Sequence, residues 1–125
     1  MTLERPILLY DGDCGFCTTS ATWIESRLGS SATVRPWRPD DATRLGVSNE
    51  AADREIHFVT PKGSVLGGAD AVLAWWRSGA AVWRILGQVL RAPMLIQLTR
   101  LGYRLVARNR HRLPGSTAAC AIPAR

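Results

Sequence analysis

The sequence has little of what several protein classes depend on. Its three cysteines in 125 residues are too few for a disulfide-stapled scaffold, and an odd number cannot pair fully within one chain. Arginines interrupt the apolar stretches, so none reaches about 18 residues, the length of a membrane span. The first apolar run is shorter than the roughly 7 to 15 residues of an export signal. These absences predict a cytoplasmic globular protein.

Acidic residues are missing from the C-terminal part of the chain. Residues 1–70 contain ten acidic and seven basic residues, whereas residues 71–125 contain nine arginines and no acidic residue. The formal charges of the two parts are therefore −3 and +9. Lys62 is the only lysine, so lysine chemistry is restricted to one position. Any attraction to an anionic partner is expected to come from the C-terminal part.

The pattern of apolar residues predicts an α/β start to the chain. Residues 6–10 form a continuous apolar run that ends at Asp-Gly-Asp, which is typical of a strand buried on both faces. From Cys17 to Leu28, apolar residues then recur every three or four positions, and Gly29 provides a stop signal. The first unit is therefore expected to be strand, turn and helix.

Further strands are expected in the middle of the chain. Residues 32–37 predict a second strand, in which Pro36 favours the edge of a sheet, and residues 40–45 predict a short helix. Residues 56–60 and 64–66 flank a Pro-Lys-Gly turn, the pattern of a β-hairpin.

Three helical runs follow the hairpin, beginning at Gly68, near Ala80 and at Pro93. The order of elements predicts a small mixed sheet covered by helices, which is a thioredoxin-like layout with a helical C-terminal extension. We expect one domain over residues 1–113 and a flexible tail over residues 114–125.

Two cysteines stand where the first strand gives way to the first helix. Cys14 and Cys17 are separated by Gly-Phe, which places two thiols one turn apart at a helix N-terminus, where the helix dipole and unpaired N–H groups favour a thiolate. We predict that Cys14 attacks a substrate disulfide and that Cys17, facing inward, resolves the mixed disulfide. Asp11 is a candidate proton acceptor and Asp13 a candidate helix cap, although both carboxylates oppose ionisation of a nearby thiol.

This segment resembles a known family. Residues 10–17, Tyr-Asp-Gly-Asp-Cys-Gly-Phe-Cys, are similar to the signature of the DCC family of predicted thiol-disulfide oxidoreductases. The similarity continues through Gly-Ala-Asp-Ala at residues 68–71 and through residues 103–110. It covers about residues 6–113.

The resemblance implies a thioredoxin-like fold, with Asp11, Cys14 and Cys17 as the functional residues. We expect no cofactor. The partners would be protein or small-molecule thiols and disulfides. The chain departs from thioredoxins themselves in one respect, since no proline stands just before the strand that begins at Ile56. Thioredoxins place a cis-proline there, facing the cysteine pair.

Inert thiols and metal binding are the alternatives for the cysteine pair. A structural zinc ion needs four ligands, and this chain would have to recruit His57, His111 or Cys120 from scattered positions. His57 in an apolar strand is more typical of a partly buried histidine, and Cys120 of a bystander, so we expect no metal.

Asp11 also suggests another enzyme class. An apolar run followed by Asp-Gly-Asp is similar to the nucleophile motif of haloacid dehalogenase-like phosphatases. That chemistry needs a lysine and further metal-binding acids downstream. Because Lys62 falls on the hairpin turn and no acid follows Asp70, we disfavour it.

A binding function is the main alternative to catalysis. Arg100, Arg104 and Arg108 recur every four residues beside leucines, which predicts an amphipathic helix. We expect the arginines to form a solvated face and the apolar residues beside them to pack against the rest of the protein. The alternative is a non-catalytic interaction module whose arginine-rich helix binds an acidic partner, a membrane surface or, least favoured, nucleic acid.

Overall fold

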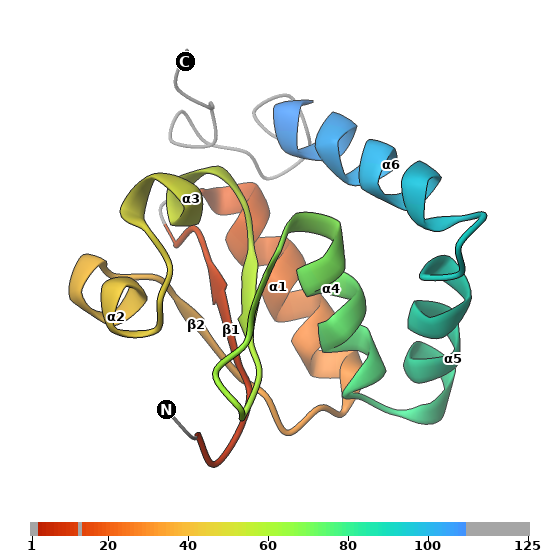
Figure 1. Cartoon of the computed structure of the whole chain (residues 1–125), viewed down its shortest axis with the longest axis horizontal. Helices are drawn as coiled ribbons and strands as arrows, with labels where there is room; N and C mark the ends of the chain where they lie inside the picture. The colour runs from red at the N-terminus through yellow and green to blue at the C-terminus, as the bar shows by residue number, and fades with distance from the viewer. Residues whose placement is uncertain (1–2, 13, 110–125) are drawn as a thin grey trace.

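A four-stranded mixed sheet lies between two layers of helices (Figure 1). The computed structural model describes residues 3–12 and 14–109. The strands are ordered β2-β1-β3-β4, with β1 parallel to β2 and antiparallel to β3, and β4 antiparallel to β3. Their bounds are β1 (Ile7–Tyr10), β2 (Thr33–Pro36), β3 (His57–Val59) and β4 (Val65–Gly67).

Helices cover both faces of this sheet. Those on one face are α2 and α3, those on the other are α1 and α4, and α5 and α6 lie beyond α4 (Figure 1). Their bounds are α1 (Gly15–Leu28), α2 (Pro39–Arg44), α3 (Asn49–Arg54), α4 (Gly68–Arg77), α5 (Ala81–Leu90) and α6 (Ile96–Asn109). The predicted thioredoxin-like architecture is confirmed. No helix among the described residues is long and apolar enough to cross a membrane.

Strand β1 is apolar throughout because both of its faces are covered. Leu8 packs on the side of α1 and α4, whereas Ile7 and Leu9 pack on the side of α2 and α3. In β3, Phe58 lies opposite Leu8 and Val59 opposite Ile7, so each pair of facing residues packs on the same side of the sheet. The continuous apolar run therefore belongs to a central strand, as predicted.

The predicted strands and turns are found close to their expected positions. Pro36 ends β2, which lies at one edge of the sheet. The hairpin is confirmed, and Gly63 in its turn has a φ of 91°, a conformation that favours glycine. Gly29, with a φ of 67°, caps the end of α1.

The helices differ from the predictions in two places. Helix α3 was not predicted, although Ser48 caps it by accepting a hydrogen bond from the Ala51 N–H at 3.2 Å. Helix α6 begins later than Pro93 because residues 91–95 form turns, in which the N–H groups of Leu95 and Ile96 both donate to the Ala92 carbonyl. The predicted tail, residues 114–125, lies outside the described residues.

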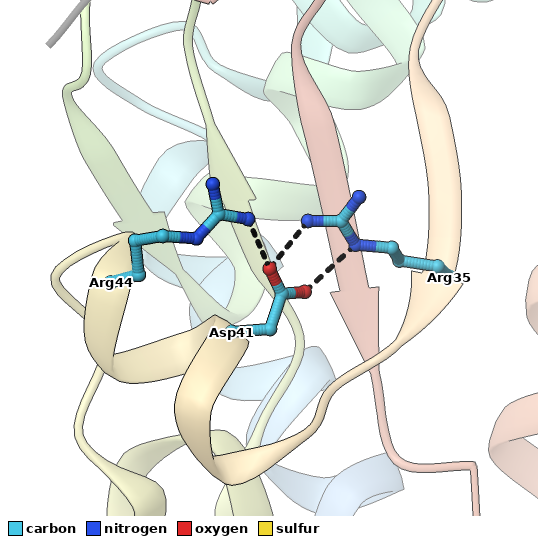
Figure 2. Close-up of polar contacts among 3 residues, drawn as sticks. All are labelled: Arg35, Asp41 and Arg44. Atoms are coloured by element: carbon cyan, nitrogen blue, oxygen red, sulfur yellow. Dashed lines mark hydrogen bonds and ion pairs between the residues drawn. The ribbon is translucent and has the colours of Figure 1, made fainter.

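A charged cluster attaches α2 to the edge of the sheet (Figure 2). Arg35 on β2 donates from Nε to Oδ2 of Asp41 at 2.8 Å and from Nη2 to Oδ1 at 2.7 Å. Arg44 donates to the same Oδ1 at 2.7 Å. The paired geometry of Arg35 fixes the orientation of α2 more strongly than a single contact would.

His57 is buried within the sheet, as expected of a histidine in an apolar strand. Its Nδ1–H donates to the Glu55 carbonyl at 3.0 Å, and Nε2 lies 3.9 Å from the Glu55 carboxylate. Burial lowers the pKa of His57 below 6.5 and outweighs the opposing effect of Glu55, while Arg54 lowers the pKa further. The folded protein therefore resists protonation of this imidazole more than the unfolded chain does.

This burial predicts a loss of stability in mild acid. As the pH falls below 6.5, the unfolded chain binds a proton that the folded protein resists, so the free energy of unfolding decreases until the folded pKa is passed. We expect wild type to lose more stability than His57→Gln in urea unfolding between about pH 7.5 and about pH 5.5. Equal losses in the two proteins would show that His57 does not control this dependence.

Candidate active site

Cys14 occupies the N-cap of α1, directly after the turn that follows β1. Its backbone is extended, with φ −90° and ψ 116°, and its Sγ accepts a hydrogen bond from the Cys17 N–H at 3.4 Å. An N-cap side chain normally satisfies such an N–H through oxygen. Here a sulfur does so, and hydrogen bonds from helix N-terminal N–H groups favour the thiolate over the thiol.

Hydrogen bonds fix the backbone on both sides of Cys14. The Cys14 N–H donates to the Asp11 carbonyl at 3.3 Å, and the Thr18 N–H donates to the Cys14 carbonyl at 3.0 Å. The Thr18 hydroxyl donates to the same carbonyl at 3.0 Å and lies 3.4 Å from the Gly12 carbonyl. These contacts hold the sulfur of Cys14 at the helix end.

Gly12 allows the turn to pass close to the neighbouring strand. A Cβ atom at this position would lie 2.5 Å from Cβ of Pro36, a distance that non-bonded carbons do not reach. The Asp-Gly-Asp sequence that ends β1 therefore needs glycine at its centre for packing against β2.

The two cysteines differ in exposure in a way that the sequence analysis did not predict. Cys14 is 0% exposed, whereas Cys17, expected to be the shielded thiol, is only partly buried. Cys14 is therefore the more enclosed of the two cysteines, which reverses the predicted arrangement.

Cys17 lies in the wall of an apolar cavity of about 230 Å³. The cavity is lined by side chains from β1, from α1, α3, α4 and α6, and from the segment before β3, among them Phe16, Ile24, Ile56, Trp75 and Tyr103. Among the described residues, Arg54 is the only charged one in the lining. A group bound here would have an apolar surface and would lie beside the second cysteine.

Tyr103 joins α6 to this cavity. Its hydroxyl accepts a hydrogen bond from the Ile56 N–H at 3.0 Å, and its ring helps to line the cavity. Sequence reasoning missed Ile56, Trp75 and Tyr103 as site residues. For Tyr103 a signal existed, because it opens the C-terminal segment that resembles the DCC family.

Asp11, the third predicted site residue, follows β1 and is 7% exposed. It is therefore a buried carboxyl group in the turn that leads to Cys14. Asp13 lies outside the described residues, as do His111 and Cys120. Among residues 3–12 and 14–109, no group of three or more histidine, cysteine, aspartate or glutamate residues could hold a metal ion.

The arginines of α6 do not form the single solvated stripe that was expected. Arg100 donates from Nη2 to Oδ1 of Asp70 on α4 at 3.2 Å, so it takes part in attaching α6 to α4. Arg104 and Arg108 are exposed. The leucines beside them are exposed as well, which corrects the expectation that the apolar face of this helix is fully packed.

Comparison with known proteins identifies the family but no individual relative. No curated protein and no solved structure matches the chain. The sequence profile of the DCC1-like thiol-disulfide oxidoreductases matches residues 8–116, which include all of β1 except Ile7, both cysteines at the start of α1, and α6. The chain belongs to the DCC1-like thiol-disulfide oxidoreductase family.

Proposed function

We propose that the protein catalyses thiol-disulfide exchange through Cys14 and Cys17. The observation that carries this proposal is the position of the Cys14 sulfur at the N-cap of α1, 3.4 Å from the backbone nitrogen of Cys17. This position favours a thiolate and keeps the second cysteine within one helical turn. Membership of the family supports the same class of reaction.

The exchange has two steps. The thiolate of Cys14 attacks one sulfur of a substrate disulfide, forms a mixed disulfide and releases the other substrate sulfur as a thiolate. The thiolate of Cys17 then attacks the Cys14 sulfur, forms the Cys14–Cys17 disulfide and releases the remaining substrate thiolate. Two electrons pass from the protein to the substrate, and the reverse sequence oxidises a substrate dithiol.

Asp11 is the proposed proton acceptor for the second step. Cys17 must lose its proton before it can attack, and a carboxylate buried in the turn before Cys14 can accept that proton. The apolar cavity beside Cys17 would receive the group attached to the substrate sulfur. The burial of Asp11 in the turn before Cys14 and the place of Cys17 in the cavity wall support these two roles.

The test is a redox equilibration of the Cys120→Ser protein, in which only Cys14 and Cys17 can form an intramolecular disulfide. The protein is equilibrated in glutathione buffers of increasing oxidation, and its thiols are trapped by alkylation and counted by mass spectrometry. We expect a reversible transition in which both thiols disappear together, with a two-electron dependence on potential. Retention of both thiols across the series would refute the proposal.

A further inference from the structure

Helix α5 carries an apolar stripe that no described residue covers. Val82, Ile85, Leu86 and Val89 recur at helical spacing and are 42 to 75% exposed. The opposite side of α5 packs on α4, where a Cβ atom at Gly87 would lie 3.1 Å from the Leu73 carbonyl oxygen. The inner face of the helix is thus occupied, and the outer face presents branched aliphatic side chains to solvent.

Helix α6 carries a second stripe of the same kind. Leu98, Leu101 and Leu105 are 51 to 65% exposed, while Tyr103 on the inner side reaches Ile56. Met94, in the connection between the two helices, is 90% exposed. We refer to the stripes of α5 and α6 together as the α5–α6 face, which belongs to the outer edge of the molecule beyond α4 (Figure 1).

The charges of these helices identify what would cover such a face. Helices α5 and α6 and their connection contain Arg84, Arg91, Arg100, Arg104 and Arg108 and no acidic residue. On α6, Arg104 and Arg108 follow Leu101 and Leu105 by three residues each, so they flank the leucine stripe. Exposed aliphatic stripes beside arginines are the pattern of helices that lie in the plane of an anionic bilayer surface.

We infer that the α5–α6 face binds anionic phospholipid membranes. The aliphatic side chains would enter the boundary between headgroups and acyl chains, and the arginines would contact the lipid phosphates. Pairing with a second copy of the chain is less favourable, because it would bring two sets of arginines together, and neither α5 nor α6 contains a carboxylate. This inference goes beyond the proposed exchange reaction and does not depend on it.

The experiment is co-sedimentation of the full chain with vesicles. One set contains equal parts of phosphatidylglycerol and phosphatidylcholine, and the other contains phosphatidylcholine alone. We expect binding to the anionic vesicles that weakens as salt is added and is at least about tenfold stronger than binding to phosphatidylcholine. Absence of binding to the anionic vesicles, or binding to both sets alike, would overturn the inference.

Paired variants test the two parts of the face. Ile85→Glu with Leu98→Glu should abolish binding, whereas Trp23→Glu, the same kind of change at an exposed residue of α1, should not. Arg104→Gln with Arg108→Gln should weaken binding about tenfold to thirtyfold. Arg5→Gln with Arg38→Gln removes equal charge from the N-terminal part and should have little effect.

Two further results would overturn the inference. One is full binding by the Ile85→Glu, Leu98→Glu protein. The other is a wild-type protein that does not bind vesicles and forms a dimer in analytical ultracentrifugation, if these substitutions dissociate that dimer. The face would then pair with a second copy of the chain. Circular dichroism confirms that each variant is folded. Should the glutamate pair fail to fold, Val82→Ser with Leu101→Ser is used in its place, and it should reduce binding.

Discussion

Replacing Cys14 by serine is expected to abolish disulfide exchange, whereas replacing Cys17 by serine should leave a trapped intermediate. A serine hydroxyl cannot attack a disulfide under conditions where a thiolate can, so the loss in Cys14→Ser should be complete. In Cys17→Ser the first step still occurs but cannot be resolved. Incubation with glutathione disulfide should therefore yield one bound glutathione per Cys17→Ser chain, detected by mass spectrometry.

The comparison is made in the Cys120→Ser background, and that parent protein serves as the control with both site cysteines intact. Cys17 is partly exposed and Cys14 is buried, so the experiment must also distinguish attack by Cys17. If Cys14→Ser accumulates the mixed disulfide and Cys17→Ser does not, then Cys17 is the attacking thiol and the assigned roles are reversed. Equal accumulation in both variants would contradict any division of roles.

Replacing Trp75 by alanine is expected to destabilise the fold by about 3 to 5 kcal/mol. Trp75 on α4 is 1% exposed and packs in the core between the sheet and α1. It also forms part of the wall beside Cys17. Its removal leaves a void that the surrounding helices can fill only in part. Urea unfolding followed by circular dichroism measures the loss.

Trp23→Ala is the matched control for this prediction. Trp23 is 52% exposed, and its ring lies 4.3 Å from the guanidinium carbon of Arg27, a contact worth about 0.5 to 1 kcal/mol at an exposed site. Trp75→Phe should cost less than Trp75→Ala, because phenylalanine still fills most of the buried space. Both substitutions remove the Trp75 Nε1–H, which is buried without a partner among the described residues. Similar losses for Trp75→Ala and Trp23→Ala would contradict this account of the core.

Local patterns predicted the elements that position the cysteines. The apolar run of β1 was sufficient to predict the strand, because a strand buried on both faces is apolar at every position. The spacing of apolar residues between Cys17 and Leu28 was sufficient to predict α1, because a helix buried on one side repeats every three or four residues. Helix α3 was not predicted because its six residues, Asn-Glu-Ala-Ala-Asp-Arg, include no large apolar side chain that would mark a buried face. Its only clear signal was Ser48, whose hydroxyl accepts a hydrogen bond at the start of the helix.

The surroundings of the cysteine pair could be predicted only in part. The N-cap position of Cys14 follows from adjacent residues, so it was accessible. The cavity beside Cys17 combines Ile56, Trp75 and Tyr103, which are far apart in the sequence and meet only because α4 and α6 pack together. Periodicity also could not show that the outer stripes of α5 and α6 remain exposed, because it finds an apolar face without showing whether that face is covered.

The part of the cavity wall contributed by α6 has a consequence for the order in which the site is completed during synthesis. Cys17 belongs to the first helix, whereas Tyr103, which anchors α6 to Ile56, belongs to the last described one. A chain emerging from the ribosome therefore exposes both thiols long before α6 is available to dock beside them. The part of the cavity wall that α6 contributes can therefore be added only after Tyr103 has been synthesised, when both cysteines have already left the ribosome.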